Sequence, residues 1–205
     1  GFRLGAVRYH HWITDFGFGR PTGIDLPGEE RGILHSPANW SDVSLAFLSF
    51  GYELSVTPLQ MARAFNVLAS GGYLMSPRLT IAPRPAASGS GGRTRILSPA
   101  TVRQMTSIMT EVVNAGTGKK ARVEGLSVAG KTGTAKKVKA GRYSNDYVAS
   151  FGGFFPAENP AMTIFVVVDE PKGLYYGGDV AAPLFRSIVE RICILRGSGL
   201  SVHPP

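Results

Sequence analysis

Residues 125–135 (Gly-Leu-Ser-Val-Ala-Gly-Lys-Thr-Gly-Thr-Ala) fit two sequence patterns that require different secondary structures around Lys131. The residues from Gly125 to Thr132 match the nucleotide-binding pattern G-x-x-x-x-G-K-[ST], in which a buried strand precedes the loop and a helix follows it. The residues from Lys131 to Ala135 are equally compatible with an extended strand. The fold open to this chain therefore depends on the residues that flank this stretch.

Both flanks argue against a nucleotide-binding loop. Residues 119–124 (Lys-Lys-Ala-Arg-Val-Glu) contain no apolar run that could form the preceding buried strand. Residues 133–141 begin with glycine and have no periodic apolar face, so they do not predict a helix. The apolar run 164–168, followed by Asp169, resembles the acidic strand of P-loop proteins, but it does not outweigh both flanks. We therefore disfavour a P-loop NTPase and expect a strand.

The composition limits the other classes of function. The chain has 205 residues, of which 43% are hydrophobic, which is enough for one hydrophobic core. Its net charge is +8, but the basic residues are scattered and form no recognisable nucleic-acid module, so we expect no nucleic-acid partner. Cys193 is the single cysteine, and the four histidines form no metal-spaced pair with a carboxylate. We therefore expect neither a metal site nor a cofactor.

The first half of the chain predicts a long loop followed by two helices. Residues 15–44 are rich in Gly and Pro and predict turns. Thr57-Pro58 and Ser98-Pro99 are typical helix starts, and the helices should end near Gly71 and Gly116. In the first helix the spacing predicts a buried face made of Leu59, Ala62, Phe65 and Ala69. Residues 83–95 have low complexity and predict a surface loop.

The second half predicts strands and a final helix. Residues 147–155 and 162–168 are strand-like and are separated by a turn-rich link, which predicts an antiparallel hairpin. An apolar pattern from about Ala182 to Leu195 predicts the last helix. Helices and strands do not alternate along this chain as they would in a parallel doubly wound sheet. The expected fold class is α+β.

An extended segment through Lys131 brings polar groups together. In a strand, Thr132 and Thr134 lie on the same side, and with the Lys131 ammonium they suit a carboxylate ligand. Gly133 has no side chain, so a substrate backbone could approach and pair as an additional strand. The N–H of Thr134 could face a carbonyl oxygen that becomes an oxyanion. The three residues Lys-Thr-Gly alone are also compatible with an ordinary basic edge strand.

Six blocks, one of which contains the Lys131 segment itself, support the substrate-binding interpretation. In order along the chain they are Phe16-Gly-Phe-Gly, Thr22-Gly-Ile-Asp-Leu-Pro-Gly-Glu, Ser49-Phe-Gly-Tyr with Val56-Thr-Pro-Leu-Gln, Ala129-Gly-Lys-Thr-Gly-Thr-Ala, Ser150-Phe-Gly-Gly-Phe-Phe-Pro, and Tyr176-Gly-Gly-Asp-Val-Ala-Ala-Pro. With these blocks the chain resembles the C-terminal half of the transpeptidase domain of class B penicillin-binding proteins, in particular the division-type peptidoglycan synthases. The resemblance extends over about 170 residues.

The resemblance implies an antiparallel sheet flanked by helices, as in serine β-lactamases and D,D-peptidases, here incomplete. It implies a serine-type D,D-transpeptidase that cross-links peptidoglycan through the D-Ala-D-Ala stem peptide and is acylated by β-lactams. By the same resemblance Lys131 supplies charge at the floor of the site, and Thr132 and Thr134 hold the carboxylate. Gly133 belongs to the substrate-binding segment, and the Thr134 N–H supplies half of the oxyanion hole. The candidate catalytic residues are therefore Lys131 and Thr134.

The family's serine nucleophile is not found in these residues. No serine lies three positions before any lysine, and none lies two positions before any asparagine, so S-x-x-K and S-x-N are both missing. We expect residues 1–205 to be the C-terminal part of one penicillin-binding transpeptidase domain. The missing N-terminal segment would carry the nucleophile, its activating lysine and a membrane anchor, which implies the extracytoplasmic, periplasmic face of the bacterial membrane. The isolated chain is expected not to react with penicillin.

Two further expectations concern partners and acidic residues. Cell-division or elongation proteins are possible partners, and a non-catalytic interaction module or relic of the same family is an alternative function. Asp169, Glu170 and Asp179 are expected to be structural or surface residues, because nothing marks them as an acid–base pair. Glu53 departs from the small residue that is usual in the family, and we expect it to be an exposed loop side chain.

Overall fold

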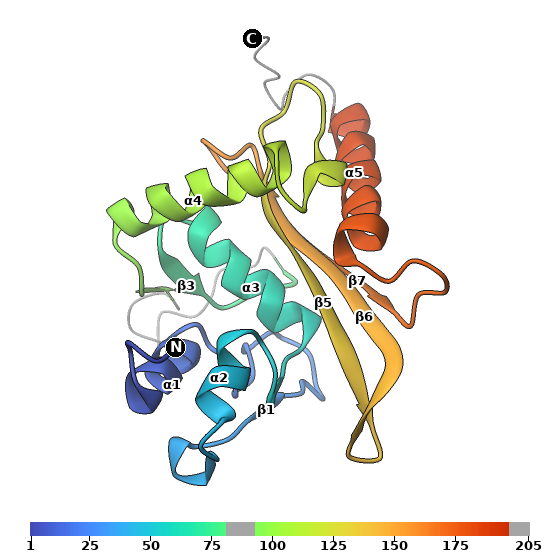
Figure 1. Cartoon of the computed structure of the whole chain (residues 1–205). Helices are drawn as coiled ribbons and strands as arrows, with labels where there is room; N and C mark the ends of the chain where they lie inside the picture. Colours follow the sequence, from blue (N-terminus) through green and yellow to red (C-terminus); the bar gives the residue numbers. More distant parts are fainter. Residues whose placement is uncertain (81–92, 197–205) are drawn as a thin grey trace.

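The computed structural model describes residues 1–80 and 93–196 of the chain (Figure 1). An antiparallel sheet lies between two helical layers, with α3 and α4 on one side and α5 on the other (Figure 1). The elements are, in order, α1 Ala6–Asp15, β1 Ile33–Leu34, η1 Pro37–Asn39, α2 Ser44–Ser49, β2 Leu54–Ser55, α3 Pro58–Ala69, β3 Tyr73–Met75, β4 Arg93–Arg95, α4 Pro99–Asn114, η3 Lys119–Ala121, β5 Ala129–Lys139, β6 Arg142–Phe155, β7 Met162–Asp169 and α5 Gly177–Arg196. The expected α+β class with an antiparallel sheet flanked by helices is confirmed.

The main sheet has the strand order β5-β6-β7, and both pairings are antiparallel. The predicted hairpin is confirmed, with Val148 opposite Asp169 at one end and Phe155 opposite Met162 at the other. Strand β6 starts at Arg142, earlier than the predicted start at Tyr147, because its polar first residues pair with β5 beyond the end of β7. The β5–β6 ribbon therefore projects past the sheet (Figure 1).

Alternate residues of β6 face opposite helical layers, as expected for a strand. Phe151 packs on Phe185 of α5, with ring centroids 4.7 Å apart, and Phe155 belongs to the same buried cluster. Phe154 packs on the other face, in a cluster with Met109 of α4. Gly152 also points to this second face, where an added Cβ would lie under 3.0 Å from the ring of Phe65 on α3. The glycine therefore sets how closely α3 approaches the sheet.

Helix α3 begins as predicted, with a capping box between Thr57 and Gln60 and proline at its first position. The predicted burial of its apolar face is wrong in degree, because these four residues are only partly buried while Gln60 and Val67 are fully buried. Gln60 can be buried because its amide donates to the carbonyl oxygens of Arg20 and Arg31, at 2.9 and 3.0 Å. This polar side chain holds the predicted Gly- and Pro-rich loop against α3.

Helix α4 is confirmed, with Ser98 capping its first turn. Two boundaries differ from the sequence-based expectation. Arg93–Arg95 form β4, which pairs with β3, whereas residues 83–92 of the predicted loop lie outside the described residues. Helix α5 starts at Gly177 rather than near Ala182, because its first glycines fit where larger residues would collide with backbone atoms. No helix within residues 1–80 and 93–196 is long and apolar enough to cross a membrane.

Candidate functional site

Lys131, Thr132, Gly133 and Thr134 lie in β5, the strand at one end of the sheet order. The predicted strand is therefore confirmed, and the nucleotide-binding pattern is contradicted. A short 3-10 helix, Lys119–Ala121, lies where a P-loop protein needs a buried strand, and β5 continues to Lys139 where it needs a helix. Because β5 pairs only with β6 among the described strands, its other edge is open to a peptide backbone.

The side chains of the Lys-Thr-Gly-Thr segment point to two faces of the sheet. Lys131 is paired with Gly152, which faces α3, whereas Thr132 is paired with Phe151, which packs on α5. Cross-strand partners share a face of the sheet. The Lys131 side chain therefore leaves the strand on the face covered by α3, and the side chains of Thr132 and Thr134 leave it on the face covered by α5. Lys131 nevertheless lines the same cleft as Thr132 and Thr134, because it lies at the open edge of β5. The predicted convergence of one ammonium and two hydroxyls is therefore present.

This cleft has a volume of about 680 Å³ and lies between the 116–120 segment, β5 and the start of α5. The Thr132 hydroxyl is 2.9 Å from the Thr117 hydroxyl. The Thr134 hydroxyl oxygen accepts a hydrogen bond of 2.9 Å from the backbone N–H of Gly177. A hydroxyl that accepts from the backbone still has its own proton to donate, so Thr134 can bind a ligand acceptor.

The charges around the cleft favour an anion. Lys119, Lys120 and Lys131 line it, and Lys120 forms an ion pair of 2.8 Å with Asp179. The positive end of the long helix α5 also borders the cleft, which Gly178 and Asp179 of its first turn line. Hydroxyl donors, ammonium groups and a helix N-terminus together suit a carboxylate ligand. Asp179, which the sequence predicts to be structural or at the surface, lines this cleft and pairs with Lys120.

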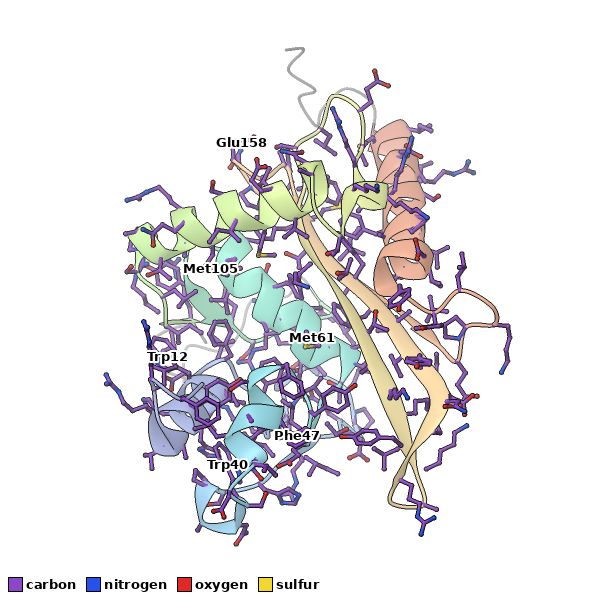
Figure 2. The ribbon with its side chains drawn as sticks, in the orientation of Figure 1. Trp12, Trp40, Phe47, Met61, Met105 and Glu158 are labelled. Carbon is purple, nitrogen blue, oxygen red and sulfur yellow. The ribbon has the colours of Figure 1, made fainter. Side chains whose placement is uncertain are left out.

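Lys131 also borders a second hollow, of about 660 Å³, on the α3 and α4 side of the sheet. The remaining lining is almost entirely apolar and includes Phe16, Met61 of α3 and Met105 of α4. Figure 2 shows Met61 and Met105 projecting from these two helices. Lys131 is thus the residue common to an anion-favouring cleft and an apolar hollow.

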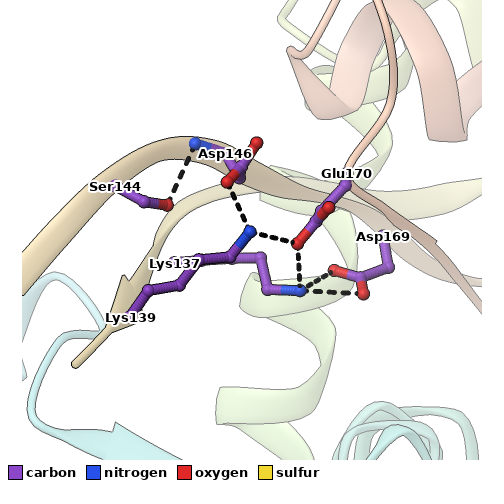
Figure 3. Close-up of polar contacts among 6 residues, drawn as sticks. All are labelled: Lys137, Lys139, Ser144, Asp146, Asp169 and Glu170. Atoms are coloured by element: carbon purple, nitrogen blue, oxygen red, sulfur yellow. Dashed lines mark hydrogen bonds and ion pairs between the residues drawn. The ribbon is translucent and has the colours of Figure 1, made fainter.

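The ribbon beyond the Lys-Thr-Gly segment is held by an ion-pair network (Figure 3). The Lys137 ammonium contacts Asp169 and Glu170 at 2.9 Å, and the Lys139 ammonium contacts Glu170 at 2.8 Å and Asp146 at 2.6 Å. Hydrogen bonds from Lys139 and then Lys137 lower the pKa of Glu170 to about 2. The expectation that Asp169 and Glu170 are structural is confirmed, because both anchor this ribbon to the end of β7.

Sequence reasoning missed the wall of the cleft opposite β5. The segment after α4 contributes Thr117, Lys119 and Lys120 to this wall. The sequence pattern there indicates only the end of a helix. Tyr176 and Asp179 lay in a recognised block but received no substrate-binding role. The sequence carries no local signal for this wall, because residues far apart in the chain meet only through the packing of α5 on η3 and β5.

Other candidate positions have no place in this cleft. Glu53 is exposed, as expected, and has a left-handed backbone with φ of 60°. Cys193 is partly buried and packs against the core cluster beneath α5. Within the described part of the chain, no group of three or more His, Cys, Asp or Glu side chains is arranged to hold a metal ion.

Comparison with known proteins identifies relatives over nearly the whole chain. Residues 2–190 match the family model of the penicillin binding protein transpeptidase domain. Stage V sporulation protein D of Bacillus subtilis is 40% identical over 198 residues, which cover 92% of this chain and 31% of that protein. Peptidoglycan D,D-transpeptidase FtsI of Escherichia coli is 40% identical over 177 residues, which cover 85% of this chain and 29% of that protein.

Solved structures of penicillin-binding proteins have the same fold as this chain. Penicillin-binding protein 3 from Mycobacterium tuberculosis, in complex with aztreonam, superposes with a TM-score of 0.84 and 31% sequence identity. That match covers 100% of this chain and 49% of the other. The chain spans about a third of the length of the curated relatives it matches. On the strength of this family match, the relatives and the shared fold, the chain belongs to the penicillin-binding-protein transpeptidase domain family.

Proposed function

We propose that this chain is the C-terminal part of a serine D,D-transpeptidase that cross-links peptidoglycan and reacts with β-lactams. The observation that carries the proposal is the cleft at the open edge of β5, where Lys131, Thr132 and Thr134 come together. The names of the relatives and the aztreonam complex of a related protein support the same activity.

Each residue of the segment has a proposed task in acyl transfer. The hydroxyls of Thr132 and Thr134 donate to the C-terminal carboxylate of a D-Ala-D-Ala peptide, or to the carboxylate of a β-lactam, and Lys131 adds positive charge. Gly133 leaves room for the peptide backbone to pair with the open edge of β5. The N–H of Thr134 forms half of the oxyanion hole, which stabilises the negative charge on the attacked carbonyl oxygen.

The proposal assigns the nucleophile to a segment N-terminal to residue 1. That segment supplies the serine and lysine of S-x-x-K, the S-x-N element and a membrane anchor, so the domain acts on the extracytoplasmic side of the membrane. Activated-serine catalysis needs nucleophile and base within hydrogen-bond reach, and these 205 residues hold no such pair in the family's spacing. No cofactor is needed, and cell-division or elongation proteins are the proposed protein partners.

Acylation of the intact protein by a fluorescent penicillin tests the proposal. Lys131→Ala should slow labelling by about 100-fold or more, because it removes charge stabilisation next to the reacting carbonyl. Lys136→Ala is the matched control, since Lys136 lies on the same strand but outside the cleft and should label normally.

Two further outcomes separate the alternatives. The isolated 205-residue chain should not be labelled stably, and stable labelling would contradict the assignment of the nucleophile. An intact protein that no penicillin labels would instead favour a non-catalytic interaction module of the same family.

A further inference from the structure

Positive charge is concentrated in one part of this chain, in a stretch without any acidic residue. From residue 54 to residue 110 the sequence contains six arginines but no aspartate, glutamate or lysine. This stretch forms α3, the β3–β4 hairpin and most of α4. A long stretch of one charge sign creates a positive field over the elements that it builds, and such a field attracts anionic partners.

Two of these arginines lie on the outer face of the β3–β4 hairpin. Tyr73 pairs with Arg95 and Met75 with Arg93, whereas Leu74 between them is buried. Cross-strand partners share a face and successive residues alternate, so both arginines share the outer face with the Tyr73 ring and Met75. We call these four residues the hairpin face. The hairpin packs beside α3, across the main sheet from α5, and contributes no residue to the β5 cleft (Figure 1).

Both guanidinium groups of the hairpin face are held around one aromatic ring. The guanidinium carbon of Arg93 lies 3.6 Å from the centroid of the Tyr73 ring, and that of Arg95 lies 4.1 Å from it. Arg95 also donates to the carbonyl oxygens of Gly71 and Leu97, at 3.0 and 3.1 Å. An arginine that is already held in place loses less conformational entropy on binding than a freely moving one. The two charges are therefore pre-organised for a ligand.

These two charges are not neutralised by a carboxylate of the described structure. Neither Arg93 nor Arg95 forms an ion pair within residues 1–80 and 93–196. Two guanidinium groups beside one ring repel each other, and their contacts with the ring offset this repulsion only in part. An anion that binds both groups removes the repulsion. The hairpin face therefore favours an anionic partner.

The hairpin face also presents apolar surface next to its charges. Strand β4 contributes the two arginines, about 7 Å apart along the strand, and β3 contributes a parallel row of Tyr73 and Met75 about 5 Å away. Met75 is 36% exposed. A phosphate polymer has no apolar group for this second row. An amphipathic helix can present an acidic row beside an apolar row, with residues four positions apart spaced by about 6 Å along its axis.

We infer that the hairpin face is a docking surface for an acidic amphipathic helix of a protein partner. Arg93 and Arg95 bind the carboxylates of that helix, and Tyr73 and Met75 contact its apolar side chains. The surface lies outside the cleft that carries the proposed transpeptidase function. The inference therefore stands or falls independently of that function.

Fluorescence anisotropy of the intact protein with a labelled peptide tests the inference. The probe is an alanine-based helical peptide with three glutamates spaced four residues apart and a leucine three residues after each glutamate. Arg93→Gln should weaken binding about fivefold at about 50 mM salt, which is the upper range for the loss of one exposed charge pair. Arg93 is substituted rather than Arg95, because Arg95 also bonds to the backbone at Gly71 and Leu97. Salt at about 0.3 M should weaken wild-type binding and reduce the difference.

Three controls separate local recognition from general charge effects. Arg191→Gln removes the same charge from an exposed position of α5, across the sheet, and should bind the peptide like the wild type. Lys119→Gln removes a charge from the β5 cleft and should also leave peptide binding unchanged. The same peptide with glutamine in place of its glutamates should bind at least about tenfold more weakly.

Four results overturn the inference. The first is no binding of the peptide to the wild-type protein at about 50 mM salt. The second is equal weakening in Arg93→Gln and Arg191→Gln, which would show that only the net charge matters. The third is loss of binding in Lys119→Gln, which would assign the peptide to the cleft. The fourth is tighter binding of a polyphosphate of equal charge, which would favour a phosphate polymer over a protein.

Failure of the proposed function gives a different result. Arg93→Gln and the wild type should be labelled equally by a fluorescent penicillin, because Arg93 lies outside the β5 cleft. An intact protein that binds the acidic peptide but is not labelled by penicillin would contradict the proposed function and leave the docking surface supported.

Discussion

The backbone N–H of Gly177 donates a hydrogen bond of 2.9 Å to the hydroxyl of Thr134, and so ties the first residue of α5 to strand β5. Gly177 lies so close to the sheet that an added Cβ would come under 3.0 Å from the backbone oxygens of Gly133 and Ser150. The helix start and the substrate-binding segment are therefore one packed unit. A substitution at the start of α5 should therefore also alter the substrate-binding segment of β5.

Gly177→Ala should destabilise the protein and slow its acylation together. Alanine favours a helix over glycine by about 1 kcal/mol, but the collision with fixed backbone atoms costs about 1–3 kcal/mol and affects two oxygens. We expect a net loss of about 1 kcal/mol in the free energy of unfolding. Thermal unfolding and fluorescent-penicillin labelling of the intact protein measure the two effects.

Ser187→Ala is the control for this substitution, because Ser187 lies on an exposed position of the same helix. It should leave both stability and labelling near the wild-type values. Equal behaviour of the two variants would show that the close approach of Gly177 to β5 is not needed.

The ion-pair network at the β5–β6 ribbon should make the ribbon sensitive to acid. The folded-state pKa of Glu170 is about 2, below its ordinary value of 4.5, so its stabilising contribution is present above pH 4.5 and is lost as pH falls toward 2. Hydrogen bonds to Asp169 raise the pKa of Lys137, and hydrogen bonds to Asp146 raise that of Lys139. The lysine contributions are therefore complete below pH 10.5 and are lost only as pH rises beyond it.

Glu170→Gln tests this pH dependence. In the wild type, amide hydrogen exchange of residues 137–146 should accelerate between pH 4.5 and 2 beyond the intrinsic change in exchange rate. In Glu170→Gln the ribbon should already exchange faster at pH 6 and show a smaller further acceleration in that window, because Asp146 and Asp169 still pair with the two lysines. Identical exchange of the two proteins at pH 6 would contradict the role of the network.

Local signals in the sequence were enough for the helix starts and for the Lys131 strand. Thr57-Pro58 and Ser98-Pro99 predict their helices because a cap and a proline act within one turn. The strand through Lys131 is predictable because the glycines and the missing apolar face exclude the helix that a nucleotide-binding loop requires.

The start of α5 and the far wall of the cleft could not be predicted in this way. Gly177 and Gly178 have low helix propensity, and the reason for them is packing against β5 and Thr117, which no local pattern reveals. The Lys120–Asp179 pair joins residues 59 positions apart. Both features follow from tertiary contacts rather than from local preference.

Glu53→Gly should stabilise the protein slightly. Glu53 is exposed and has a φ of 60°, a conformation that costs a residue with a Cβ about 1–2 kcal/mol. Glycine removes that cost but adds about 0.4–1 kcal/mol of unfolded-state entropy, so the net gain should be about 0.5 kcal/mol. Glu53→Ala keeps the Cβ and should bring no gain. Equal melting temperatures for the Gly and Ala variants would show that the backbone conformation is not strained.

Gln60→Leu should cost more stability than any surface change in this chain. The Gln60 side chain is 1% exposed, donates to the carbonyl oxygens of Arg20 and Arg31, and accepts from the backbone N–H of Thr57. Leucine fills a similar volume but leaves these three backbone groups without their partner, at about 1–3 kcal/mol for each group that stays buried. We expect a loss of about 3 kcal/mol in the free energy of unfolding, measured by chemical denaturation.

Hydrogen exchange should rise first in residues 20–31, since the Gln60 side chain bonds that loop to α3. Gln60→Glu keeps the acceptor but not the amide donors, so it should free the loop while retaining more of the helix cap. Unchanged protection of residues 20–31 from exchange in Gln60→Leu would contradict the role of Gln60 in holding the loop.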